Sequence, residues 1–193
     1  MVRIVAGVAG GRRLAVPPRG TRPTSDRVRE AMFSALQARR NLHGARVLDL
    51  YAGSGALGLE ALSRGAAHVR FVESDRPAVA VLRRNVETLG LGGPGGAAVW
   101  VSAADVPAVL RGDPGLPYDV VLADPPYALG DAALGGVLCA LADGGWLAPS
   151  ALLVVERPVR ALTPAWPIGV SALTHRRYGD TVIYYGVHDG YLP

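Results

Sequence analysis

Four consecutive residues, Asp124-Pro125-Pro126-Tyr127, have the side chains in this sequence that most directly suggest a reaction. They follow the apolar run 120–123, which is typical of a buried parallel strand. Open α/β sheets place their chemistry just past the carboxyl ends of such strands. A carboxylate, a proline-fixed carbonyl and an aromatic ring suit a flat heterocycle with a free amino group, because two acceptors can bind both N–H hydrogens while the ring stacks on the base. The pattern predicts methyl transfer onto an exocyclic amine, with Asp124, Pro125 and Tyr127 as catalytic residues.

The segment 47–55, Val-Leu-Asp-Leu-Tyr-Ala-Gly-Ser-Gly, reads as a strand that runs into a glycine-rich turn and opens a helix. Glycines allow a ligand to approach the backbone closely, and a helix start offers unpaired N–H groups. Glu73 ends the next expected strand, where a carboxylate can accept both hydroxyls of a ribose. We therefore expect a nucleotide cofactor to be bound by Asp49, Tyr51, Gly53, Gly55 and Glu73.

The same segment also satisfies the dinucleotide fingerprint G-x-G-x-x-G, from Gly53 to Gly58, and Glu73 falls twenty residues after Gly53. Taken alone, the segment does not separate a nicotinamide oxidoreductase from a methyltransferase. Three features favour the methyltransferase. A dinucleotide site has no need of a charge at Asp49, the 124–127 element has no role in hydride transfer, and a closing antiparallel hairpin suits a methyltransferase sheet.

The contact to an adenine ring is less clearly marked. Methyltransferases often present an acid after the strand expected at 97–102, but here Ser102-Ala103-Ala104 precedes Asp105. Ala104, through its backbone, and Asp105 are the candidates, and Asp105 serves equally well as a helix cap.

Strands and helices alternate from Arg46 onward, which predicts a parallel α/β sheet. The expected strands are 46–51, 68–73, 97–102, 118–123 and 150–156, with helices at 56–64, 76–89, 105–111 and 130–143. Two β-rich runs, 169–176 and 181–187, predict a closing antiparallel hairpin. Before the sheet, residues 1–20 predict a β-hairpin, and Thr24 or Ser25 caps a helix. We expect a hairpin-and-helix appendage over 1–40 and a catalytic domain over 41–193.

Charge is unevenly distributed along the 193 residues. All twenty basic residues are Arg; the segment before Val47 has a net charge of +8, and the rest of the chain −4. A basic appendage on an acidic body predicts a surface for a phosphate backbone, and a solvated basic face is the alternative. The candidate RNA-binding residues are Arg3, Arg12, Arg13, Arg22, Arg27 and Arg29.

Other features of the composition exclude several classes of protein. The apolar runs are far too short for a membrane span, and no signal-peptide pattern is present, so we expect a cytoplasmic protein. The four His residues have no metal-ligand spacing, and we expect no metal. The single Cys139 is expected in the core.

With these residues in view, the chain resembles the bacterial 16S ribosomal RNA guanine-N2 methyltransferase family. The resemblance covers nearly the whole length, and the segment that begins Arg22-Pro23-Thr24 is its family-specific part. It also includes the segments 3–7, 11–14, 48–55, 124–127 and 178–181. It implies S-adenosylmethionine as methyl donor, a Rossmann-like class I sheet of seven strands, and one guanine of 16S ribosomal RNA or the small ribosomal subunit as target. A monomer is expected.

Two alternatives stay open at this point. The 124–127 tetrapeptide also occurs in adenine-N6 and cytosine-N4 methyltransferases, so the substrate could be adenine in DNA or another RNA. A nicotinamide-dependent oxidoreductase is the alternative from a different class. Because the pocket is expected to belong to the sheet, deletion of residues 1–20 is predicted to leave cofactor binding intact.

Overall fold

The computed structural model describes residues 2–17, 25–92 and 96–190, which form fourteen elements. In chain order these are β1 (Val2–Arg3), β2 (Arg13–Leu14), α1 (Asp26–Gln37), β3 (Arg46–Leu50), α2 (Ala56–Ser63), β4 (His68–Glu73), α3 (Arg76–Leu89), β5 (Ala98–Ala103), α4 (Val106–Leu110), β6 (Tyr118–Ala123), α5 (Asp131–Asp143), β7 (Leu147–Pro158), β8 (Val170–Tyr178) and β9 (Thr181–His188). The predicted elements are confirmed, and the main differences are a hairpin shorter than expected and a longer β7.

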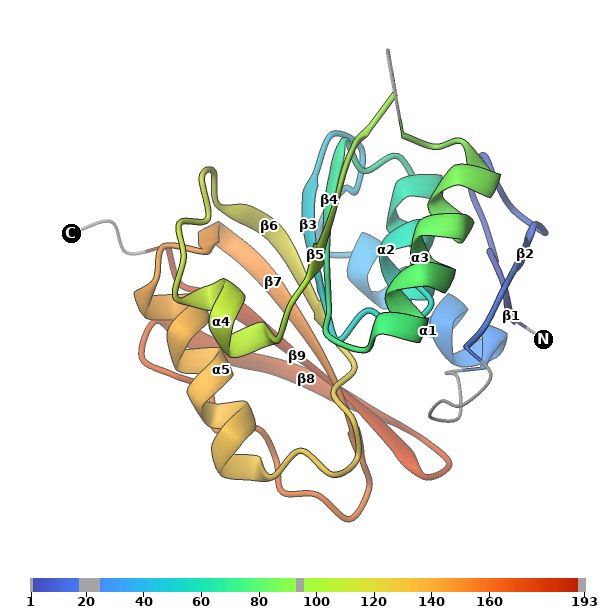
Figure 1. Cartoon of the computed structure of the whole chain (residues 1–193). Coiled ribbons are helices and arrows are strands. Elements are labelled where there is room, and N and C mark those ends of the chain that lie inside the picture. Colours follow the sequence, from blue (N-terminus) through green and yellow to red (C-terminus); the bar gives the residue numbers. More distant parts are fainter. Residues whose placement is uncertain (1, 18–24, 93–95, 191–193) are drawn as a thin grey trace.

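Seven strands form one mixed sheet in the order β5-β4-β3-β6-β7-β9-β8 (Figure 1). The first five in this order pair in parallel, while β9 pairs antiparallel with β7 and β8 antiparallel with β9. The predicted Rossmann-like class I methyltransferase sheet is confirmed. After β5 the chain crosses to the other side of β3 to form β6, so the order of strands reverses between β3 and β6. Open α/β sheets bind ligands at such a switch point.

Helices cover both faces of the sheet (Figure 1). Buried side chains of α1, α2 and α3 form one apolar cluster with alternate residues of the strands, such as Val47, Val69 and Leu122. Helices α4 and α5 form a second cluster with the residues that point the other way, such as Leu48 and Val121. Because side chains alternate across a strand, the strands buried on both faces are nearly continuous apolar runs.

Capping residues set the starts of three helices. The side chains of Ser25, Asp75 and Asp105 accept hydrogen bonds from the backbone N–H groups three residues later. Such caps satisfy donors that a helix start leaves unpaired. Ser25 is thus one of the two predicted caps of α1, whereas Thr24 lies outside the described residues.

The N-terminal hairpin and α1 pack into the same core as the sheet. Val2 and Ile4 of the hairpin and Phe33 of α1 are at most 2% exposed and belong to the cluster on that face. The functional division of the chain at residue 40 stays a prediction, because no gap in packing marks it.

One core prediction is wrong. Cys139 is exposed, because it lies on the outer side of α5 while its neighbour Leu138 points into the core. In the described ranges, no helix is long and apolar enough to cross a membrane. No group of three His, Cys, Asp or Glu side chains that could hold a metal ion occurs there either.

Candidate active site

Strands β3, β4 and β6 lie side by side, and an acidic side chain stands near the carboxyl end of each: Asp49, Glu73 and Asp124. Their charges act on one another, since Glu73 raises the pKa of Asp49 and Asp49 raises that of Asp124. The expected cofactor and acceptor residues are therefore neighbours across the point where the strand order reverses. This edge of the sheet is the candidate active site.

The glycine-rich turn between β3 and α2 is fixed by backbone hydrogen bonds. The Ala52 N–H donates to the carbonyl of Val72 at 3.1 Å, and the Gly55 N–H donates to the carbonyl of Ala52 at 2.7 Å. Tyr51, Gly53 and Gly55 all have positive φ, of 60°, 55° and 83°. Glycine adopts this region freely, but Tyr51 does so at a cost of about 1–3 kcal/mol, which is typical of residues held at functional sites.

Glu73 ties this turn to the end of β4. Its Oε2 accepts from the Gly53 N–H at 2.8 Å, and its Oε1 accepts from the Asp75 N–H at 2.7 Å. Each carboxylate oxygen can accept a further hydrogen bond. Glu73 is half-buried and lines the cavity described below. It is thus held by backbone donors with acceptor capacity left for a pair of ligand hydroxyls.

Asp49 lies beneath the turn and is 1% exposed. Its Oδ2 accepts from the Gly58 N–H at 2.8 Å, while Oδ1 is buried without a hydrogen-bond partner among the described residues. Burial raises the pKa of Asp49 to about 7, and Glu73 adds to the rise while the bond from Gly58 opposes it. An orphaned acceptor under a glycine-rich turn fits a bound group that brings a donor or a positive charge.

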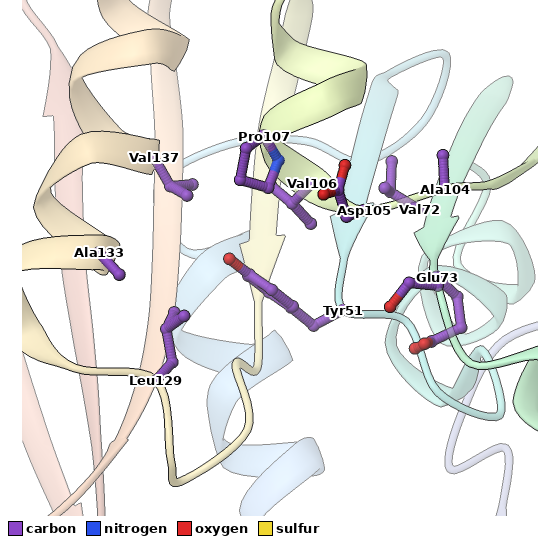
Figure 2. A pocket seen from close by; sticks show the side chains of 11 residues that line it. Tyr51, Val72, Glu73, Ala104, Asp105, Val106, Pro107, Leu129, Ala133 and Val137 are labelled. Atoms are coloured by element: carbon purple, nitrogen blue, oxygen red, sulfur yellow. The ribbon is translucent and has the colours of Figure 1, made fainter.

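A cavity of about 220 Å³ opens beside the turn. Figure 2 shows the Tyr51 ring across its middle, with Glu73 and Asp105 on one side and Leu129 and Val137 on the other. Ala104, Val106, Pro107 and Ala133 are also among its lining residues. The walls are mainly apolar with acids at one side, as flat heterocycles with polar edges require.

Both adenine candidates line this cavity. Asp105 also has the capping role that the sequence suggested, because its Oδ1 accepts from the Ala108 N–H at 2.9 Å. The two roles are compatible, since a carboxylate has several lone pairs.

The four residues 124–127 begin directly after β6, as predicted. Pro125 is buried, whereas the Tyr127 side chain is 41% exposed and free to meet a base that arrives from solvent. The pKa of Asp124 is raised well above its usual value, mainly by burial and further by the charges of Glu156 and Asp49. A carboxyl group whose pKa is raised in this way is typical of reaction centres.

Arg157 of β7 holds the chain that follows this element, although the sequence analysis did not single it out. It is 3% exposed, and its Nη2 donates to the carbonyl of Leu129 at 3.0 Å and to Asp131 Oδ1 at 2.8 Å. It therefore ties the turn after Tyr127 to the start of α5. The pair of charged residues Glu156-Arg157 directly after the apolar run 151–155 was the available signal.

Only part of the predicted RNA-binding set is available for RNA. Arg29 contradicts the prediction, because it is 1% exposed and its Nη2 donates to Asp26 Oδ1 at 2.8 Å and to the carbonyl of Arg3. Its place three and four residues before Met32 and Phe33 puts it on the buried stripe of α1, which the helical spacing could have shown. Arg22 lies outside the described residues.

The other four predicted arginines are exposed but differ in their contacts. The Arg3 guanidinium pairs with Asp26 at 2.8 Å, and that of Arg12 donates to the carbonyls of Thr88 and Leu89 at the end of α3. Arg13 and Arg27 make no side-chain hydrogen bond or ion pair with any residue in the described ranges.

Buried polar residues of α2 and α3 were also missed by the sequence analysis. Glu60 and Ser63 of α2, and Asn85 of α3, are at most 3% exposed, and all three bind the backbone of the N-terminal hairpin segment. Asn85 shares a helix face with Leu82 and Leu89, and a polar residue on an apolar stripe was the signal that could have found it.

The chain is similar to a protein family, to named proteins and to solved structures. The family model described as conserved hypothetical protein 95 matches residues 2–187. Ribosomal RNA small subunit methyltransferase D of Escherichia coli K12 is 42% identical over 167 residues, which are 86% of this chain and 79% of the relative. The protein of the same name from Haemophilus influenzae is 39% identical over 80% of this chain and 78% of its own.

Solved structures agree with these sequence matches. The Escherichia coli protein yhhF, for which methyltransferase activity has been suggested, matches with a TM-score of 0.86 and 35% identity over 98% of this chain and 99% of its own. SMU.776, whose structure is a complex with SAH, matches with a TM-score of 0.64 over 84% of this chain and 48% of its own. At 15% identity this second match shows a shared fold only.

Proposed function

We propose that this chain methylates the exocyclic N2 amine of one guanine in 16S ribosomal RNA, with S-adenosylmethionine as donor. The chain belongs to the conserved hypothetical protein 95 family and to the family of ribosomal RNA small subunit methyltransferase D. Family membership supports the reaction on small-subunit RNA. One observation carries the choice of an amine as acceptor: Asp124 and Pro125 stand at the end of the central strand β6, next to the strand that ends in the glycine-rich turn.

The residues of the pocket fit S-adenosylmethionine. Glu73 would accept the ribose hydroxyls, and the apolar cavity beside Ala104 and Asp105 would take the adenine ring. The turn from Tyr51 to Gly55 would lie against the methionine part, above the orphaned Oδ1 of Asp49. When bound, S-adenosylmethionine supplies a methyl group on a positively charged sulfur, which is an electrophile for a nitrogen lone pair.

Asp124, Pro125 and Tyr127 would prepare the acceptor. A guanine N2 lone pair is delocalised into the ring, so the amine is a weak nucleophile. Hydrogen bonds from its two hydrogens to the Asp124 carboxylate and the Pro125 carbonyl favour a pyramidal nitrogen. Fixed acceptors of this kind contribute by placement and electrostatics. Asp124 is also positioned to hold the proton that the amine loses, and the exposed Tyr127 ring can stack on the extruded base, worth about 1–3 kcal/mol.

The hairpin and α1 would dock the RNA. We expect phosphate contacts from Arg13 and Arg27, and from the exposed Arg3 and Arg12 where their protein contacts leave donors. A monomer would suffice, because the acids at the ends of β3, β4 and β6 all come from one chain.

Methyl incorporation is the direct test of this proposal. The purified protein should transfer labelled methyl groups from S-adenosylmethionine to 30S particles or 16S RNA, and nucleoside digestion should yield N2-methylguanosine. Duplex DNA is the control substrate. Label recovered as N6-methyladenosine would replace the guanine assignment by the adenine alternative, and incorporation only into DNA would exclude ribosomal RNA as the substrate.

A further inference from the structure

We infer that Asn85 is a positioning residue through which the N-terminal hairpin completes the cofactor site. The inference rests on the proposed function for the identity of the cofactor. It adds that residues of the hairpin, which do not line the cavity, contribute to cofactor affinity through one buried amide.

Asn85 binds the hairpin and the glycine-rich turn at the same time. Its Oδ1 accepts from the Ala15 N–H at 2.9 Å, and its Nδ2 donates to the Ala15 carbonyl at 2.9 Å. The second hydrogen of Nδ2 is donated to the carbonyl of Ser54 at 2.9 Å. The amide thus binds both backbone polar groups of Ala15, the residue that follows β2. Because Asn85 is only 3% exposed, water cannot easily take the place of a lost hydrogen-bond partner.

The bond to Ser54 fixes a peptide inside the cofactor turn. The Ser54 carbonyl points to Asn85, while the N–H of the same peptide, which belongs to Gly55, donates to the Ala52 carbonyl at 2.7 Å. Asn85 and Ala52 thus hold the two ends of one peptide group between Gly53 and Gly55. Because glycine neighbours make this peptide easy to rotate, the bond from Asn85 adds to that from Gly55 to Ala52 in keeping its orientation.

Other contacts of the hairpin segment do not involve the turn. Glu60 accepts from the Val5 and Ala6 N–H groups at 2.7 and 3.0 Å. Ser63 accepts from the Ala9 N–H at 2.9 Å. These contacts join the segment to α2, so Ser63 offers a matched control that loosens the hairpin without changing Ala15, Asn85 or Ser54.

The arrangement changes one expectation from the sequence. Deletion of residues 1–20 was predicted to leave cofactor binding intact, because the pocket belongs to the sheet. Loss of Ala15 would leave two of the Asn85 hydrogen bonds unmade and the side chain free to turn away from Ser54. Cofactor affinity is therefore expected to depend on the hairpin.

Calorimetric titration of the full chain with S-adenosylhomocysteine tests the connection. Asn85→Leu, which keeps the size but removes both donors and the acceptor, should weaken binding roughly 5- to 30-fold. Ala15→Pro, which removes the N–H donated to Asn85, should weaken it about 3- to 10-fold, although Ala15 is exposed and does not line the cavity. The double variant should bind no more weakly than Asn85→Leu alone, because the two changes break one pathway. Ser63→Ala should stay within about twofold of the unchanged protein.

Three outcomes would contradict the inference. Full affinity in Ala15→Pro would show that the hairpin does not act on the turn, and this variant remains informative if Asn85→Leu does not fold. Equal reductions of affinity in Ser63→Ala and Asn85→Leu would show a general loosening instead of a specific connection. If the unchanged protein does not bind S-adenosylhomocysteine at all, the proposed function fails, and the inference with it.

Discussion

Asp49 and Asp124 end neighbouring strands, but they differ in how their oxygens are used. Asp49 is fully buried and holds the start of α2 through the Gly58 N–H, so it supports the glycine-rich turn that precedes this helix. Asp124 is only partly buried and begins the segment that carries the exposed Tyr127. The same residue type is thus assigned to donor binding at one strand end and to acceptor binding at the next.

Substitution of Asp124 should separate these two roles. Asp124→Ala is expected to lower kcat by about 10²–10³, because it removes a preorganised acceptor, while S-adenosylhomocysteine affinity stays within several fold. Single-turnover methylation and calorimetry measure the two quantities. Asp143→Asn, an exposed acid at the end of α5, is the control and should change neither. Methylation by Asp124→Ala at the unchanged rate would remove Asp124 from the mechanism.

The pH dependence of the reaction follows from the raised pKa of Asp124. Burial and the charges of Glu156 and Asp49 keep this carboxyl protonated to a higher pH than an ordinary aspartate. Only the ionised carboxylate can accept hydrogen bonds at both oxygens, so its ability to bind the amine increases as the pH rises. We expect kcat/KM to increase with pH through the apparent pKa of Asp124 and then to level off. Asp124→Asn cannot ionise and should lose this rise; a rise of the same shape in that variant would assign it to another group.

Asp49 should make the fold less stable at high pH. Its pKa is about 7 in the folded chain against 3.8 for the ordinary group, so the folded state binds the proton more tightly than the unfolded state. The stabilisation is complete below pH 3.8 and is lost as the pH rises through about 7, with a total on the order of 4 kcal/mol.

Urea unfolding at pH 5.5 and 8.5 measures this effect. The free energy of unfolding should be lower at pH 8.5 than at pH 5.5. In Asp49→Asn the decrease should be smaller, and what remains of it should come from the raised pKa of Asp124. An unchanged difference in Asp49→Asn would mean that Asp49 is not the group responsible.

Helix α2 approaches the sheet at a distance that only glycine allows. A Cβ added at Gly58 would lie 2.3 Å from Cε1 of Phe71 and 2.8 Å from Cγ1 of Val69, both on β4. The third glycine of the G-x-G-x-x-G pattern therefore serves close helix–strand packing, which is a task shared by methyltransferase and dinucleotide folds. This shared task explains why the pattern alone left the cofactor open.

Two alanine substitutions in helices should have opposite effects. Gly58→Ala is expected to destabilise the fold by about 1–3 kcal/mol through overpacking and to weaken cofactor binding, because the Gly58 N–H holds Asp49. Gly136→Ala at an exposed position of α5 is the matched control: its added Cβ meets no atom within 4 Å, and the fold should gain about 0.5–1 kcal/mol. Denaturant midpoints test both, and a stabilised Gly58→Ala would show that α2 can move away from the sheet.

Elements were predictable from the sequence because each has a strong local pattern. Strand β6 contains the apolar run 120–123, and α3 is capped by Asp75, has a proline in its first turn and is followed by Gly90 in the left-handed region. Hairpin β1–β2 has only two residues in each strand, and backbone N–H groups beyond it, such as those of Val5 and Ala15, donate to side chains of α2 and α3. Contacts such as Asn85 with Ala15 and Ser54 join residues far apart in sequence, and no local pattern contains them.

For the whole molecule, the N-terminal segment is more basic than the rest of the chain, but many of its arginines bind groups of the same chain. Several arginines of the basic segment bind acids or carbonyls of the chain: Arg3 and Arg29 contact Asp26, Arg40 contacts Asp119, and Arg39 donates to the Ala35 carbonyl. Sequence alone could not distinguish these from free cations, because their partners are set by the tertiary fold. Salt dependence of RNA binding is therefore expected to be smaller than a segment charge of +8 suggests.

Arg13 and Arg27 should carry a measurable share of that salt dependence. Arg27 lies in the first turn of α1, and Arg13 lies on β2 opposite Arg3, whose guanidinium binds Asp26 of the same turn. Arg13→Gln combined with Arg27→Gln should weaken RNA binding and reduce the slope of log K against log salt by about 0.7–0.9 for each phosphate that the protein no longer neutralises. S-adenosylhomocysteine affinity should not change, because neither residue lines the cavity.

Arg111→Gln, at the exposed end of α4 on the opposite face of the sheet, is the control and should keep the original slope. If the double variant also keeps that slope, RNA docks elsewhere on the molecule, and the hairpin's task is to hold the cofactor turn.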